Sequence, residues 1–76
     1  MSQIDHYERK IKKHQRNIEK QQKKIEELSD KLYQKKISED IYLKKTQKIN
    51  QHIREENSEI RILQGIIVKA RHAMNN

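Results

Sequence analysis

Four histidines, His6, His14, His52 and His72, have the widest chemical repertoire in this sequence, because imidazole serves both as a metal ligand and as an acid–base catalyst. Their spacing contains neither an H-x-x-x-H nor an HExxH pair, the arrangements that bring two imidazoles to one helix face around zinc. The chain has no cysteine to supply thiolate ligands, and its single glycine rules out a glycine-rich phosphate loop. We therefore predict no metal site, no cofactor and no catalytic residues.

The second chemical feature is a basic segment near the N-terminus. Residues 9–24 contain eight cations against one acid, Glu19, a net charge that equals the +7 of the whole chain. Clustered Lys and Arg release counterions when they bind nucleic acid, so one interpretation is a row of phosphate contacts. The other interpretation is a solvated helix face that keeps the protein in solution. We name this set the basic stripe: Arg9, Lys10, Lys12, Lys13, Arg16, Lys20, Lys23 and Lys24.

Hydrophobic periodicity predicts the elements that position these groups. Two series of residues recur at alternating steps of three and four, the heptad spacing of a coiled-coil seam, and no proline interrupts them. The first series is Ile4, Tyr7, Ile11, His14, Ile18, Gln21, Ile25, Leu28 and Leu32. The second series is Tyr42, Thr46, Ile49, Ile53, Glu56, Ile60, Leu63, Ile67, Ala70 and Met74. We predict an all-α coiled-coil protein with one domain, residues 1–76, because a chain of this length is too small for more.

The segment around residue 37 has the features of a helix start. Ser38 suits the N-cap position, and Glu39 and Asp40 suit the positive end of the helix dipole. Ile37 and Tyr42 stand at the two positions of a hydrophobic staple. This assignment predicts that one helix ends shortly before the segment and a second one begins within it.

We predict two helices, about 3–35 and 38–74, that pack as an antiparallel coiled-coil hairpin. Facing seam residues then have numbers that add to 74, and every layer opposes an a residue to a d residue. The alternative is one unbroken helix of about 70 residues that pairs with an antiparallel copy, as in domain swapping. The heptad phase runs through the turn without Gly or Pro and allows both forms. We favour the hairpin because the cap, the staple and two charged seam positions coincide at one place.

Three polar residues, His14, Gln21 and Glu56, occupy seam positions. Polar groups at such positions fix the register and the number of partners in a coiled coil. A rod without a concave pocket leaves no room for a substrate beside them. We therefore assign these three residues to packing specificity, and we predict that the protein is not an enzyme and has no small-molecule substrate.

The apolar segment 60–68 extends beyond the seam. Three of its residues belong to the seam, whereas Ile62, Ile66 and Val68 face elsewhere. A helix that is apolar nearly all round is usually buried all round. We predict a second interface here, either with another copy, giving a homo-oligomeric four-helix bundle, or with a different protein. The predicted interface comprises Ile60, Ile62, Leu63, Ile66, Ile67 and Val68.

The sequence has no stretch of the kind that enters a membrane. The N-terminus lacks the apolar core of a secretory signal. The longest purely apolar run is Ile66-Ile67-Val68, against the roughly 20 residues needed to span a bilayer. We predict no membrane association and a cytoplasmic location.

The stretch from Lys31 to Tyr42, KLYQKKISEDIY, resembles the tip of the coiled-coil hairpin of large serine recombinases, where a Leu-Tyr pair precedes an Ile-Ser-acidic-acidic-x-Tyr turn. The resemblance covers residues 25–50. In that family the hairpin protrudes from a DNA-binding domain and mediates contacts between recombinase subunits. These 76 residues contain neither the catalytic nor the zinc-ribbon domain of the family, and they lack the glycine often found at that turn. The resemblance implies a hairpin that engages other helical hairpins, without recombinase activity.

From these features we expect a small interaction protein that binds and regulates a larger protein through its helix faces. Its size and basicity suit a phage- or plasmid-encoded accessory factor. One alternative is an RNA- or DNA-binding helical bundle that uses the basic stripe. Another is a scaffolding oligomer.

Overall fold

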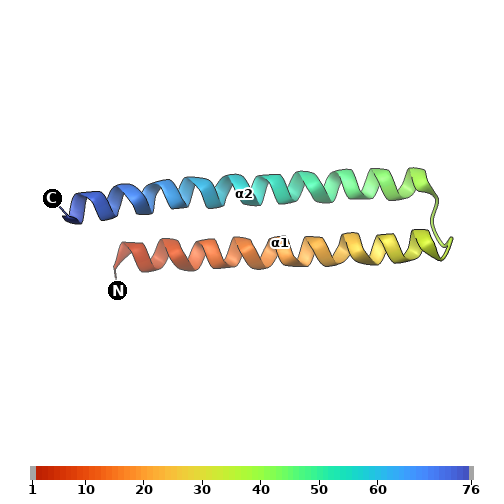
Figure 1. Ribbon diagram of the computed structural model, residues 1–76, viewed down its shortest axis with the longest axis horizontal. Helices are drawn as coiled ribbons and strands as arrows, with labels where there is room; N and C mark the ends of the chain where they lie inside the picture. The colour runs from red at the N-terminus through yellow and green to blue at the C-terminus, as the bar shows by residue number, and fades with distance from the viewer. Residues whose placement is uncertain (1, 76) are drawn as a thin grey trace.

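Two antiparallel helices make up the part of the chain that the structure, a computed structural model, describes, residues 2–75 (Figure 1). Helix α1 spans Gln3–Tyr33 and helix α2 spans Glu39–Asn75, and a short turn joins them. The start of α1 and the end of α2 lie together at the opposite end of the rod (Figure 1). The rod measures 59 × 18 × 12 Å. The predicted antiparallel helical hairpin is confirmed.

Helix α1 ends in a Schellman motif. The N–H of Lys36 donates to the carbonyl of Lys31 at 2.8 Å, and the N–H of Lys35 donates to the carbonyl of Leu32 at 3.0 Å. Lys35 has a φ of 59°, the left-handed conformation that glycine usually takes at this position. Because Lys35 leaves the helical conformation, α1 ends at Tyr33, two residues before the predicted end at residue 35.

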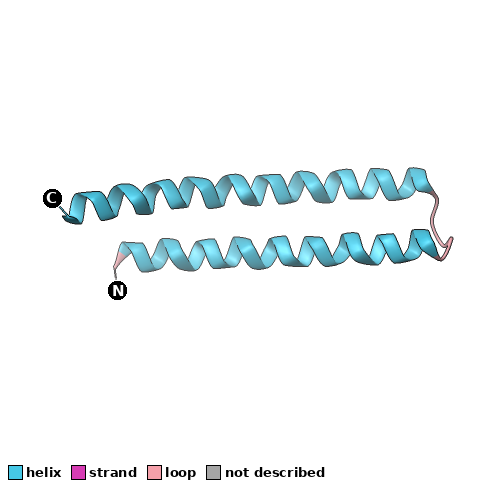
Figure 2. Ribbon diagram, in the orientation of Figure 1, coloured by secondary structure: helices cyan, strands magenta, loops and turns pink. Residues whose placement is uncertain are grey.

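Helix α2 starts as predicted. The Oγ of Ser38 accepts a hydrogen bond from the N–H of Ile41 at 3.2 Å, which makes Ser38 the N-cap. Glu39 and Asp40 occupy the first turn, and the staple residues Ile37 and Tyr42 are half-buried. Because the Schellman motif ends α1 and the Ser38 N-cap begins α2, the chain turns over residues 34–38 (Figure 2). The structure is the hairpin and not the unbroken helix.

The contact between the helices follows the two predicted heptad series. Every seam residue within 4–32 and 42–70 is buried or half-buried. Met74, also placed on the seam, is instead 72% exposed. Met74 continues the heptad spacing beyond the last predicted layer, and α1, which begins at Gln3, has no residue to place opposite it.

The hairpin core is thin. Among residues 2–75, four apolar side chains, Leu28, Ile60, Leu63 and Ile67, are buried, and three of them lie in the half of α2 remote from the turn. Thr46 is buried on the seam, and its hydroxyl donates to carbonyls one turn back in its own helix at 2.8 and 3.1 Å. The core therefore stabilises the end of the rod opposite the turn more than the turn itself.

Candidate functional site

A polar cluster joins the helices on the seam. Glu56 of α2 is held from α1 by His14, whose Nδ1 bonds to Oε2, and by Asn17, whose Nδ2 donates to Oε1 at 3.4 Å. The side chains of His14 and Glu56 are 25% and 24% exposed, so water reaches the cluster from the side. The heptad pattern predicted His14 and Glu56 here but not Asn17. The signal for Asn17 was its spacing of three residues from His14, which puts both on one side of α1.

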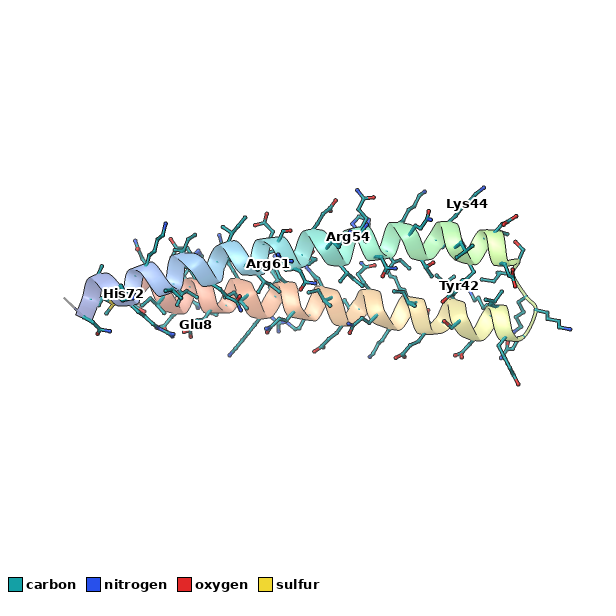
Figure 3. All side chains as sticks on the ribbon, turned by 45° about the horizontal axis from the view of Figure 1, so that its top comes forward. Glu8, Tyr42, Lys44, Arg54, Arg61 and His72 are labelled. Atoms are coloured by element: carbon teal, nitrogen blue, oxygen red, sulfur yellow. The ribbon has the colours of Figure 1, made fainter. Side chains whose placement is uncertain are left out.

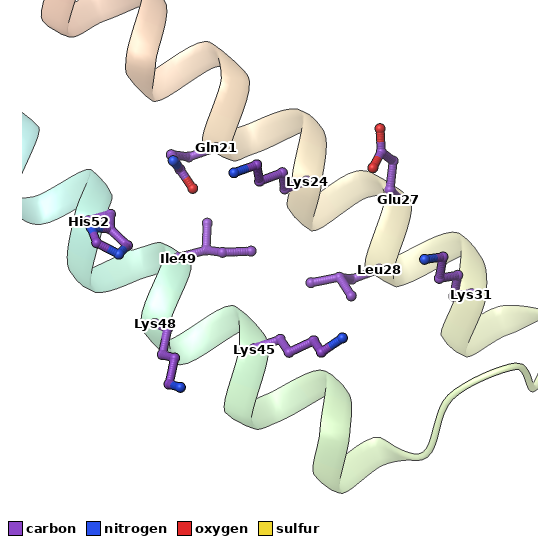
Figure 4. A pocket seen from close by; sticks show the side chains of 9 residues that line it. All are labelled: Gln21, Lys24, Glu27, Leu28, Lys31, Lys45, Lys48, Ile49 and His52. Carbon is purple, nitrogen blue, oxygen red and sulfur yellow. The ribbon is translucent and has the colours of Figure 1, made fainter.

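The other histidines do not join this cluster. Within residues 2–75, no three His, Cys, Asp or Glu side chains are placed to share a metal ion. His52 pairs with Glu55 of its own helix at 3.7 Å. Gln21, the third polar seam residue, is half-buried and lies beside the groove shown in Figure 4. His14 and Glu56 thus link the two helices, and the role in packing specificity assigned to them and to Gln21 stays a prediction.

All eight residues of the basic stripe are exposed on α1. They occupy heptad positions b, c, f and g, outside the a and d positions that form the seam. In the part of the chain that the structure describes, none of them forms a salt bridge, since the three ion pairs present involve other residues. The stripe is therefore a cationic surface that the hairpin leaves uncompensated.

The six residues of the predicted apolar interface fall into three groups: those buried in the hairpin core and those exposed on two different sides of α2. Ile60, Leu63 and Ile67 are buried against α1, as their seam positions require, whereas Ile62, Ile66 and Val68 are 57%, 37% and 56% exposed. At about 100° per residue, Ile62 and Ile66 lie about 40° apart and adjoin on the surface of α2. Val68 projects from the other side of the helix, about 200° from Ile66.

Val68 belongs to a groove of about 450 Å³ at the open end of the hairpin, where it lies beside Ile11 and Ile67. Glu8 and Arg71 stand in the same groove, and the Arg71 guanidinium donates to Glu8 at 2.9 Å. Both side chains are substantially exposed, so this ion pair contributes at most about 1 kcal/mol.

A second groove, of about 410 Å³, runs between the helices near the turn (Figure 4). Leu28 and Ile49 point toward each other at its base, and Glu27 is the one acid among its lining residues. The lysines that line it come from both helices: Lys24, Lys31, Lys45 and Lys48. Of these, the charge pattern along the sequence indicated only Lys24. The others were missed because the groove exists only once the chain folds back on itself.

Side chains project from all sides of the rod (Figure 3). Tyr42 lies between the helices near the turn, where its hydroxyl is 3.2 Å from the Oγ of Ser29. Lys44, two residues along, points away from α1 (Figure 3). Neither α1 nor α2, as described, has a stretch long and apolar enough to cross a membrane.

The chain matches no protein-family model, and comparison with curated proteins and with solved structures gives no significant match. The surfaces of the hairpin itself are therefore the basis for a proposed function.

Proposed function

We propose that this chain is a small, non-enzymatic, cytoplasmic interaction protein that self-associates and that binds and regulates a larger protein through its helix faces. The observation that carries the proposal is the exposure of Ile62 and Ile66 as neighbours on α2, at 57% and 37%. Adjoining large apolar side chains on a surface are typical of protein–protein contact sites.

The shape of the hairpin supports the same proposal. Its accessible surface is 6473 Å², against roughly 5,000 Å² for a compact monomer of this mass. Its radius of gyration is 17.4 Å, against about 11 Å for a compact domain of this length. A rod this thin leaves exposed a surface that compact proteins bury, and a partner helix along one face would cover it.

Partner capture tests the proposal directly. Tagged wild-type chain and an Ile62→Glu/Ile66→Glu variant are incubated with lysate of the native host, with and without nuclease. We expect the wild type to retain a larger protein after nuclease treatment and the variant to lose it. Lys44→Glu, a charge change on the outer side of α2, is the matched control and should behave as wild type. Capture that is equal for all three chains, or that nuclease abolishes, would contradict the proposal.

Self-association is tested by sedimentation equilibrium of the same proteins. The Ile62→Glu/Ile66→Glu variant should sediment as the 9.3 kDa monomer, because carboxylates that lose water on association would replace the apolar side chains that the contact covers. A second variant, Val68→Glu, changes the apolar surface on the other side of α2, so comparison of the two variants shows which surface mediates self-association. A mass unchanged by both replacements would mean that neither surface mediates self-association.

A second candidate function is binding of RNA or DNA, favoured by the eight exposed cations of the basic stripe. Binding to duplex or folded RNA should then weaken steeply with salt, since several counterions are released. Reversing Lys12, Lys20 and Lys23 to Glu should abolish binding and leave the far-UV helix signal intact, because none of them lies on the seam. An affinity no better than about 10⁻⁴ M at physiological salt would mean weak, non-specific contact only.

A further inference from the structure

Helix α2 carries a second row of heptad-spaced residues outside its seam with α1. The row steps by four and three residues from Ile41 to Ile66, and every member is exposed. It lies about 110° around the helix from the seam, so a helix docked on it would leave α1 in place. The half nearer the turn contains Ile41, Lys45, Lys48 and His52, and the other half contains Glu55, Glu59, Ile62 and Ile66.

The two halves of the row are complementary when the row meets an antiparallel copy of itself. Residues whose numbers add to 107 then face one another: Ile41 with Ile66, Lys45 with Ile62, Lys48 with Glu59, and His52 with Glu55. Each acid meets a basic residue, the apolar ends meet each other, and the aliphatic stem of Lys45 covers Ile62. A register shifted by one heptad would place Ile41 opposite Glu59 and would lose this match.

We infer that two copies of the hairpin pair through this row, α2 against α2, with a two-fold axis between residues 53 and 54. The inference rests on the proposed self-association and specifies its surface and register. Two-fold symmetry makes each pairing occur twice, so a modest preference per pair is doubled.

The charges of the row are available for such pairing. Among residues 2–75, Lys45, Lys48 and Glu59 take part in no salt bridge, and His52 pairs with the neighbouring Glu55 at 3.7 Å. Ile41 and Ile62, near the two ends of the row, are 44% and 57% exposed. Pairing would therefore neutralise free charges and cover apolar surface together.

The mixture of signs selects a second copy over other occupants. An acidic partner helix would satisfy Lys45 and Lys48 but would meet like charge at Glu55 and Glu59. Nucleic acid would meet the same two acids. A second copy presents each half of the row to the other, and the dimer contact lies on α2, so the basic stripe on α1 stays outside it except at Lys24, which lines the same groove as Lys45 and Lys48.

Charge reversal tests the register. Lys48→Glu alone places two carboxylates face to face, and Glu59→Lys alone places two ammonium groups face to face. Each single variant should raise the dimer Kd about tenfold or more in sedimentation equilibrium at low salt. An equimolar mixture of the two variants should dimerise at least as tightly as wild type, because every 48–59 pair is then opposite in charge. Lys44→Glu, off the row on the same helix, should leave the Kd unchanged, and far-UV circular dichroism verifies that each variant remains helical.

A mixture that stays monomeric, or single variants with the wild-type Kd, would overturn this register. If Ile62→Glu/Ile66→Glu still lowers the mass in that case, self-association stands and only the pairing is wrong. If the mixture dimerises while no larger protein is captured, the pairing stands and the proposed regulation of a larger protein fails.

Discussion

Lys35 stands where Schellman motifs most often have glycine, and its φ of 59° is the left-handed conformation. A residue with a Cβ is about 1–2 kcal/mol less stable there than in its preferred conformations. The turn forms despite this strain because the backbone bonds of Lys35 and Lys36 close α1 and the Ser38 cap opens α2. The strain at a single residue thus limits the stability of the turn.

Lys35→Gly is therefore expected to raise the free energy of unfolding by up to about 1 kcal/mol, since glycine takes a positive φ without strain but gains freedom in the unfolded chain. Urea denaturation measures the change. The matched control, Lys36→Gly, lies where φ is not positive and should lower stability. If Lys35→Gly were destabilising by about 1 kcal/mol, as glycine is inside a helix, the unbroken helix would be favoured instead.

The His14–Glu56 contact gives a second prediction at the residue scale. Replacing either residue with Leu should lower the free energy of unfolding by about 1 kcal/mol, because the remaining polar group is left half-buried without its partner. Replacing both should recover or exceed the wild-type value, because Leu suits a coiled-coil seam and apolar replacement of such pairs is often stabilising. Thermal unfolding of the four proteins gives the coupling energy. If the double variant loses as much free energy of unfolding as the two single variants together, the result would contradict a direct contact between His14 and Glu56.

At the scale of the element, α2 does more than pair with α1. It supplies the exposed Ile62 and Ile66, the second row and half of the groove near the turn. It also contains the one glycine of the chain, Gly65, in its interior, where glycine is about 1 kcal/mol less favourable than alanine. A Cβ at Gly65 would meet nothing within 4 Å, so the hairpin itself does not require glycine there.

Gly65→Ala should accordingly raise the free energy of unfolding by about 1 kcal/mol. Ser58→Ala, one heptad earlier on the same outer side of α2, is the control and should give a smaller gain. Chemical denaturation of both variants measures the difference. If Gly65→Ala is stabilising and also weakens capture of a larger protein, the partner approaches the backbone at Gly65. A destabilising Gly65→Ala would contradict the open space around this residue.

On the scale of the whole molecule, the hairpin is a rod in which no described side chain is completely buried. Most of its seam is only half-buried, because two helices cover each other on one side and leave the flanks to water. The proposed self-association would add stability to this thin core by packing further helices along it. Association and folding are expected to be linked.

The melting temperature of the wild type should therefore rise with protein concentration. By mass action, association adds about 1.6 kcal/mol of stability per chain when the total concentration is a hundred times the dimer Kd, because only about 7% of the folded chains then remain monomeric. Circular dichroism melts from micromolar to millimolar protein measure the effect. The Ile62→Glu/Ile66→Glu variant should melt at a lower temperature that does not change with concentration. A wild-type melting temperature independent of concentration would exclude linked self-association.

Local sequence patterns were sufficient to predict most of the fold. Heptad spacing predicted which face of each helix is buried against the other, because a period of about 3.5 residues marks one helix face whatever the partner is. The start of α2 was predicted from Ser38, since an N-cap depends only on residues within one turn. The assignment of Ile62 and Ile66 to the surface followed from the same spacing. These features depend on neighbours in the chain.

The remaining features depend on where the second helix lies. The residue type at position 35 does not predict the positive φ of Lys35, because the capping of both helices imposes that conformation. Met74 follows the heptad pattern but has no opposing residue, and only the relative lengths of the two helices decide this. The Asn17–Glu56 bond joins residues far apart in the chain, and the groove lined by both Lys24 and Lys45 does so as well. They exist because the turn sets the register between α1 and α2, and that register is a property of the folded pair.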